Sequence, residues 1–242
     1  MQGWALILGA SGDIGTQTAQ DLAQQGWSLY LHYFNHQEKA QQLQQELHAK
    51  YPRQDFLLVQ ADLTQPNSAQ AIAHQLFGLD AVIFAQGTTD YGLFAQEDPG
   101  ALNQMLAMQV QTPLSLVQIL QPKLAASQHG RIVFVGSVYG GAGSAMEVGY
   151  STVKGALTAF ASAYSQEVAS MGITVNVIAP GAVATRMNLT FTPEERDEVA
   201  AQIPAGHFAQ PEEISYWICS LLDQRAGYLT GQTIYVTGGW LK

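Results

Sequence analysis

Tyr150 and Lys154 have the types and spacing that best suit chemistry in this chain. They stand four residues apart in Tyr150-Ser-Thr-Val-Lys154, and no other tyrosine has a lysine at this spacing. In a helix the phenol and the amine would share one face. A neighbouring ammonium stabilises a phenolate, so we expect Lys154 to lower the tyrosine pKa from its usual value near 10. Such a tyrosine can exchange a proton with an alcohol or carbonyl oxygen during hydride transfer.

Ser137 completes a possible catalytic group. It lies thirteen residues before Tyr150 and follows the apolar run Ile132–Val135, at the end of an expected strand. A serine hydroxyl there can hold and polarise the oxygen that the tyrosine protonates. The three residues predict an enzyme that interconverts a ketone and a secondary alcohol.

A glycine-rich turn follows the first apolar run, Trp4–Leu8. Glycines let a backbone turn tightly and approach a pyrophosphate, and the next helix offers N–H groups and a partial positive charge. Alone, such a turn could also be purely structural. We expect it to bind a dinucleotide through Gly9, Ser11, Gly12, Asp13, Ile14 and Gly15.

The next two strand ends bear on the adenosine half of the cofactor. Leu31–His36 contains no carboxylate for a ribose 2′-hydroxyl, which favours NADP(H) over NAD(H). No arginine is present either, and Asn35, His36 and Lys39 are the nearby candidates for the 2′-phosphate. Asp62, followed by Leu63, is a candidate adenine contact; the alternative is that Asp62 caps the next helix.

Apolar runs and helical patterns alternate along the whole chain. Several runs are continuously apolar, as in strands that are covered on both faces. The alternation predicts an α/β fold: one doubly wound Rossmann domain over residues 1–242, with a parallel seven-stranded sheet and helices on both faces. The segment 185–210 shows no strand pattern and follows a strand end, so we predict a substrate lid there; the alternative is a plain surface helix and loop. The expected strands are Trp4–Leu8, Leu29–Tyr33, Phe56–Gln60, Ala81–Ala85, Ile132–Val135, Ile173–Ile178 and Thr233–Val236, and the expected helices are Ile14–Gln25, His36–Lys50, Pro66–Phe77, two segments within Glu97–Ala126, Val148–Met171 and Pro211–Leu222.

The net charge of the chain argues against nucleic acids and anionic membranes as partners. Ten basic and nineteen acidic residues give a net charge of −9, with a pI near 4.9. Such a chain lacks the basic stripe of a nucleic-acid binder and would be repelled by anionic membranes. Cys219 is the only cysteine, and the six histidines show no ligand-like spacing with it, so we expect no metal site. Without a signal-peptide pattern or a membrane-length apolar run, we expect a cytoplasmic protein.

These motifs together resemble the short-chain dehydrogenase/reductase family across nearly the whole chain. The resemblance rests on Gly9, Ser11, Ile14 and Gly15, on Ser137, Tyr150 and Lys154, and on the segments Asn176–Thr185 and Tyr228–Gly239. It implies that Lys154 and Tyr150 also contact the cofactor, and that the family's usual homotetramer forms. The helix stripe Leu157, Phe160, Ala161 and Tyr164 could serve that assembly or the core. The resemblance further implies cofactor contacts at Ala85, Gly87, Pro180, Gly181, Val183 and Thr185.

The chain departs from the family pattern in three places. The middle glycine of the phosphate turn is replaced by Asp13, with Gly12 one place earlier. The usual Asn-Asn-Ala-Gly reads Phe84-Ala-Gln-Gly87, so the packing on the adenosine side must differ. The asparagine that holds a relay water falls on Gln109, which keeps the amide but moves it by one methylene.

Within the family the chain looks most like 3-oxoacyl-acyl-carrier-protein reductases, through Gly130–Ser137 and Glu167–Gly181. Those enzymes dock an acidic carrier on two arginines, where this chain has Gln128 and Met171. An acidic protein without those cations would repel such a carrier. We therefore expect a ketone or alcohol substrate that is small or tethered, reduced with NADPH.

Two alternatives stay open. The displaced Asn-Asn-Ala-Gly motif and Gly87–Phe94 resemble the reductases of the aminopentanone group on elongation factor P, where Asp90, Glu97 or Glu147 could attract an amino-ketone. Surface solvation is the other role for these three acids. The second alternative is a regulator that senses NADP without turnover, although such a protein has no need of Ser137, Tyr150 and Lys154.

Overall fold

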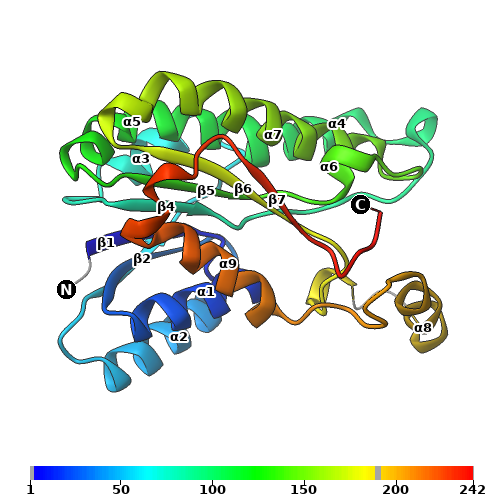
Figure 1. Ribbon diagram of the computed structural model, residues 1–242, viewed down its shortest axis with the longest axis horizontal. Coiled ribbons are helices and arrows are strands. Elements are labelled where there is room, and N and C mark those ends of the chain that lie inside the picture. Colours follow the sequence, from blue (N-terminus) through cyan, green and yellow to red (C-terminus); the bar gives the residue numbers. More distant parts are fainter. Residues whose placement is uncertain (1–2, 189–191, 242) are drawn as a thin grey trace.

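The computed structural model describes residues 3–188 and 192–241 (Figure 1). Within these ranges seven strands form one sheet in the order β3-β2-β1-β4-β5-β6-β7, and every neighbouring pair is parallel. The predicted α/β fold is confirmed, and each strand boundary lies within two residues of the expected one. The strands are β1 (Gly3–Leu8), β2 (Trp27–Tyr33), β3 (Phe56–Gln60), β4 (Ala81–Phe84), β5 (Arg131–Val135), β6 (Thr174–Pro180) and β7 (Thr233–Val236).

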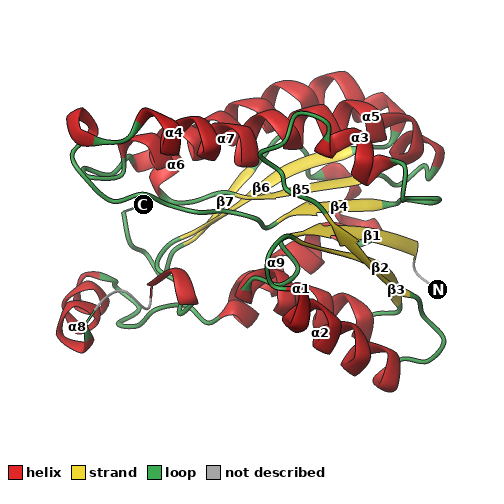
Figure 2. Cartoon of the chain, turned by 180° about the vertical axis from the view of Figure 1, so that it is seen from behind, coloured by secondary structure: helices red, strands yellow, loops and turns green. Residues whose placement is uncertain are grey.

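Helices cover both faces of the sheet (Figure 2). One face carries α1 (Asp13–Gln24), α2 (Gln37–Lys50) and α9 (Pro211–Leu222), and the other carries α3 (Ser68–Ala73), α4 (Pro99–Leu106), α5 (Thr112–Ala126) and α7 (Val148–Val168). Shorter elements complete the described chain: α6 (Tyr139–Ala142), α8 (Pro193–Gln202), the π-helical turn η2 (Ala107–Gln111), and the 3-10 turns η1 (Phe94–Gln96), η3 (Ala169–Met171), η4 (Arg186–Asn188) and η5 (Gln224–Tyr228).

Two apolar cores lie on either side of the sheet. Successive side chains of β1 alternate between them, because neighbouring residues of a strand point to opposite faces: Ile7 faces one core, and Leu6 and Leu8 face the other. Every residue of β2, β4, β5 and β6 is buried, which explains why apolar residues in these strands do not alternate with polar ones. Leu157 and Ala161 of α7 belong to the core that contains Leu6 and Leu8, where they are 3% and 1% exposed. These two residues of the helix stripe therefore pack inside the chain and not against another subunit.

The segment 185–210 leaves the sheet after β6 and returns to it. A bridge between Val183 and Ala209 brings the two ends of the segment together. Between them α8 lies away from the sheet (Figure 1), and its first turn is stabilised by a capping box of Thr192 and Glu195. Residues 189–191 of the predicted lid lie outside the described residues, and closure of the segment stays a prediction. In the parts of the chain that the structure describes, no helix has the length and apolar character needed to cross a lipid bilayer.

Candidate active site

Ser137, Tyr150 and Lys154 come together beyond the carboxyl end of β5. Ser137 follows this strand, and the other two lie one turn apart on α7. The hydroxyl of Ser137 is hydrogen-bonded to the phenol of Tyr150, and Nζ of Lys154 lies 5.5 Å from the centroid of the tyrosine ring. Lys154 is 4% exposed, and its Nζ donates to the carbonyl of Val135 at 2.9 Å. The serine, the phenol and the amine thus share one site.

The phenol of Tyr150 is protonated at neutral pH. Burial raises its pKa to about 12, the charge of Glu147 and the nearby Tyr139 also raise it, and the bond with Ser137 lowers it. Burial lowers the pKa of Lys154 to about 8. The pKa of Tyr150 is therefore raised in this structure, against the expectation that Lys154 lowers it, because burial of the phenol dominates and Lys154 is not among the groups that shift this pKa. A neutral phenol suits protonation of a carbonyl oxygen.

Gln109 reaches the same site from a π-helical turn. η2 separates α4 from α5, and Gln109 within it is 1% exposed. Its Nε2 donates to the carbonyl of Thr88 at 2.9 Å, whereas its buried Oε1 has no partner among the described atoms. A Cβ on Gly87 would lie 3.1 Å from this oxygen and 3.6 Å from Nζ of Lys154, so the two groups flank the same glycine. A buried acceptor without a partner marks a place where a water or ligand can bind.

The turn after β1 requires glycine at two positions. Gly9 has a φ of 76°, and a Cβ on Gly15 would lie 2.2 Å from the carbonyl oxygen of Gly9. Gly12 precedes α1 without a side-chain cap, so the first N–H groups of the helix have no intrahelical acceptor. Donors at the positive end of a helix fit the phosphates of a dinucleotide. Of the other predicted contacts, Ser11 lies in this turn, and Asp13 and Ile14 are the first two residues of α1.

His32 also belongs to this site, although no motif marked it. It is the residue before the last in β2 and is 3% exposed. The N–H of Gly9 donates to its Nδ1 at 3.1 Å, and its Nε2 lies 3.1 Å from the carbonyl oxygen of Ala61, so Nε2 carries the proton and donates. Burial lowers the pKa of His32 to about 4. The neutral ring therefore ties the phosphate turn to the chain that follows β3. A polar residue inside a fully buried strand was the signal in the sequence.

The adenosine side lies at the ends of β2 and β3. Asn35 is exposed just after β2, with no acid beside it in Leu31–His36. Asp62 follows β3, and its Oδ1 accepts from the N–H of Thr64 at 2.9 Å and from its hydroxyl at 2.7 Å. Burial alone would raise the pKa of Asp62, but these bonds outweigh it and lower the pKa. The capping alternative for Asp62 is wrong, because Asn67 is the residue that precedes α3. Leu63 beside it is buried.

The remaining predicted contacts follow β4 and β6. Ala85 and Gly87 come directly after β4, and Pro180 is the last residue of β6. Except for Gln109, Tyr150, Lys154 and the first residues of α1, the predicted site residues are on strand ends or the turns after them, at the edge where open α/β sheets bind ligands. The turn after β6 holds Gly181, Val183 and Thr185. Among the described residues, no group of three His, Cys, Asp or Glu side chains could hold a metal ion.

Comparison with known proteins gives the family. The family model described as Enoyl-(Acyl carrier protein) reductase matches residues 9–241. The chain belongs to the short-chain dehydrogenase/reductase family. It is 38% identical to the uncharacterized oxidoreductase YmfI of Bacillus subtilis, over 98% of both chains. It is 30% identical to the 3-oxoacyl-[acyl-carrier-protein] reductase FabG of Escherichia coli, over 97% of this chain and 96% of FabG.

Solved structures of short-chain dehydrogenases/reductases have the same fold. The angucycline C-6 ketoreductase LanV with bound NADP superposes with a TM-score of 0.91 and 26% identity, covering 98% of this chain and 95% of LanV. The L-sorbose reductase of Gluconobacter frateurii, complexed with NADPH and L-sorbose, superposes with a TM-score of 0.92 and 25% identity. The match covers 99% of this chain and 97% of the reductase. This short-chain dehydrogenase/reductase is therefore an oxidoreductase, and the donors of its phosphate turn suit a nicotinamide cofactor.

Proposed function

We propose that the protein reduces a ketone to a secondary alcohol with NADPH. The observation that carries the proposal is a protonated Tyr150 held by Ser137, with Lys154 buried behind the ring. A phenol whose pKa is raised keeps its proton until a stronger base forms beside it. The oxygen of a ketone becomes such a base as it is reduced.

Each residue then has a role. A nicotinamide cofactor bound at this site would supply the hydride. Ser137 donates a hydrogen bond to the carbonyl oxygen and Tyr150 gives it the proton. Lys154, an ammonium below pH 8, replaces the proton through a water that donates a hydrogen bond to Oε1 of Gln109. On the cofactor, we assign the pyrophosphate to the turn Gly9–Gly15, the nicotinamide end to Pro180, Gly181, Val183, Thr185, Tyr150 and Lys154, and the adenosine side to Asn35, Asp62, Leu63, Ala85 and Gly87.

NADPH is favoured over NADH by the sequence after β2. A carboxylate there would bind a ribose 2′-hydroxyl and repel a 2′-phosphate, and Leu31–His36 has none. The similarity to LanV and to L-sorbose reductase supports the same choice, since their structures hold NADP and NADPH.

The substrate is a 3-oxoacyl-type ketone that is free or tethered to something other than an acidic carrier protein. The similarity to FabG supports the 3-oxoacyl group. Gln128 and Met171 are exposed and uncharged, so they offer no cation to an acidic partner. We expect a homotetramer in the cytoplasm, as the family resemblance implies.

An amino-ketone on elongation factor P is the second candidate substrate, and Glu147 favours it. The charge of Glu147 is close enough to raise the pKa of Tyr150, and its Oε1 accepts from the hydroxyl of Thr89 at 2.8 Å. Glu97 is near as well, since a Cβ on Gly149 would lie 2.5 Å from its Oε1. Carboxylates beside the phenol suit a substrate that carries an ammonium group.

NADPH oxidation with β-keto esters, diketones and amino-ketones tests both candidates. Tyr150→Phe should lower kcat at least about a hundredfold while NADPH still binds, because general acid catalysis contributes that much. The control, Tyr228→Phe, removes the hydroxyl of a fully exposed tyrosine and should leave the rate unchanged. Full activity in Tyr150→Phe would rule out the proposed acid. Tight NADPH binding without turnover of any ketone would favour the sensing regulator.

The panel also separates the substrates. Preference for a carrier-bound over a free β-keto ester would overturn our exclusion of the carrier. Preference for the amino-ketone, lost in Glu147→Gln, would support the second candidate. In cells, if the modification of elongation factor P is unchanged after deletion of the gene, the amino-ketone is excluded as the substrate.

A further inference from the structure

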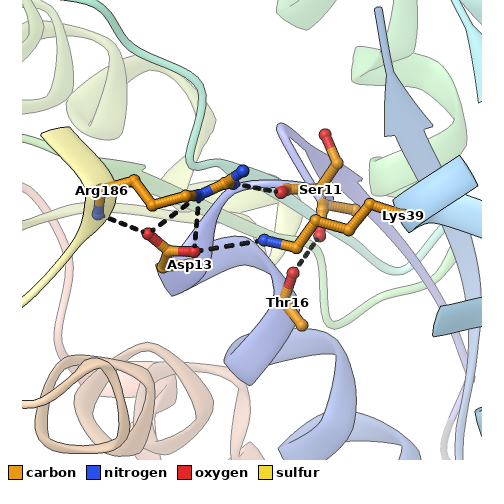
Figure 3. Close-up of polar contacts among 6 residues, drawn as sticks. Ser11, Asp13, Thr16, Lys39 and Arg186 are labelled. Atoms are coloured by element: carbon orange, nitrogen blue, oxygen red, sulfur yellow. Dashed lines mark hydrogen bonds and ion pairs between the residues drawn. The ribbon is translucent and has the colours of Figure 1, made fainter. Parts of the chain in front are cut away.

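Arg186, in the segment after β6, is bound to the start of α1 (Figure 3). Its backbone N–H donates to Oδ2 of Asp13 at 2.7 Å, and its Nε lies 3.1 Å from Oδ1 of the same carboxylate. Its Nη2 donates to the carbonyl of Ser11 at 2.9 Å. The main chain and the side chain of one residue thus join two segments that lie 173 positions apart in the sequence.

This contact is more than a single surface ion pair. Nζ of Lys39 also lies 3.2 Å from Oδ1 of Asp13, so cations from two elements meet at the carboxylate. Burial alone would raise the pKa of Asp13, but the hydrogen bonds and charges of Arg186 and Lys39 outweigh it and lower the pKa, so the carboxylate is ionised. Asp13 is also the first residue of α1, where the positive end of a helix favours a negative side chain. Several charges in one network can hold a chain segment, whereas an isolated exposed pair contributes little.

The contact fixes one end of the turn after β6. Val183 and Thr185, two of the contacts proposed for the nicotinamide end, lie just before Arg186. The N–H of Ala184 between them donates to the carbonyl of Ala209 at 2.8 Å, which holds this turn against the chain that leads to α9. Arg186 holds the turn against the phosphate turn on the other side. Both contacts are made within the chain, so they need no cofactor.

We propose that Asp13 and Arg186 are positioning residues that hold the two halves of the cofactor site together. Through this pair, the turn assigned to the pyrophosphate fixes the place of the turn that meets the nicotinamide end. A segment that is already in place loses less conformational freedom when a ligand binds, and this strengthens binding. Arg186 also offsets the charge of Asp13, which would otherwise repel the phosphates. The inference rests on the proposed use of a nicotinamide cofactor.

Calorimetric titration with NADPH and with 2′-phospho-ADP-ribose, which lacks the nicotinamide, tests this without turnover. Asp13→Ala should weaken NADPH about 3- to 10-fold, the effect of a half-exposed charged network, because the nicotinamide turn must then be ordered on binding. The same change should leave 2′-phospho-ADP-ribose as tightly bound as in the wild type or tighter, because a negative charge beside its phosphates is gone. The control, Arg225→Met, removes another arginine–aspartate pair, with Asp223 before β7, and should change neither affinity.

Arg186 is tested by a second variant. Arg186→Met should weaken both ligands several-fold, because Asp13 then lacks its main counter-ion beside the phosphates. Adding Asp13→Ala should restore the affinity for 2′-phospho-ADP-ribose and leave NADPH weakened. In the protein without cofactor, amide hydrogen exchange measured by NMR should be several-fold faster at Arg186 in Asp13→Ala than in the wild type, while Ala184 stays protected.

Three results would overturn the inference. They are unchanged NADPH affinity in Asp13→Ala, a parallel loss of both ligands in that variant, and unchanged hydrogen exchange at Arg186. If the wild type binds NADPH, any of these leaves the proposed function intact and this inference alone fails. A wild type that binds neither ligand defeats the proposed function as well.

Discussion

His32 predicts how the phosphate turn responds to acid. Its ring accepts from Gly9 and donates to Ala61 only while neutral, and burial lowers its pKa from 6.5 to about 4. Between these values the unfolded chain binds a proton and the folded chain does not, so stability falls as pH falls. Between pH 7.5 and pH 5 the free energy of unfolding should fall by about 2 kcal/mol through His32 alone. The full loss from this residue, reached below pH 4, is about 3 kcal/mol.

Urea unfolding of the wild type and His32→Leu at pH 7.5 and pH 5 measures this. At pH 7.5 the variant should lose about 2–4 kcal/mol, because two buried backbone groups, the N–H of Gly9 and the carbonyl of Ala61, lose their partners. Between the two pH values it should lose about 2 kcal/mol less than the wild type. His74→Leu, at an exposed histidine, should keep the wild-type dependence. The same pH dependence in His32→Leu and the wild type would refute the reasoning.

Three further predictions concern the turn, the catalytic amine and the segment after β6. Gly15→Ala should destabilise the protein by about 1–3 kcal/mol, because its Cβ would lie 2.2 Å from a carbonyl oxygen; calorimetry should show a lower Tm, whereas Gly92→Ala, with open space around it, should not. Ketone reduction should fall as pH rises above about 8, where Lys154 loses its proton, and be flat just below that value; a rate that rises through pH 8 would exclude the ammonium as the proton source. Protease cleavage within 192–210 should slow when NADPH is present, and unchanged cleavage would argue against a lid.

Most of the fold was predictable because apolar runs report burial directly. The boundaries of β3, β7 and α9 match the expected ranges, since turn residues or a proline border each run. α3 is shorter than the expected Pro66–Phe77, because Gln65 and Ser68 form a local turn before the helix begins. The catalytic group was predictable because its residues occur as a spaced motif on one helix.

Other parts of the site depend on contacts that no local pattern reveals. Asp13 meets Arg186 across 173 residues, so its partners could not be read from the phosphate turn. The raised pKa of Tyr150 depends on how much water the folded chain removes from the phenol, which spacing does not encode. His32 was missed because its place in the apolar run Leu29–Tyr33 indicates only that the ring needs buried partners, and these partners, Gly9 and Ala61, are distant in the sequence.

The π-helical turn η2 makes the site sensitive to chain length. A π turn contains one residue more than an α turn, and each helical residue turns the chain by about 100°. Deleting Val110 or Gln111 would rotate Gln109 by about that angle relative to α5 and carry its amide away from Lys154, while Leu116 could keep its place in the fold. A one-residue deletion could thus remove the amide without any substitution at position 109. A scan of insertions and deletions would reveal this dependence, whereas a scan of substitutions would pass over it.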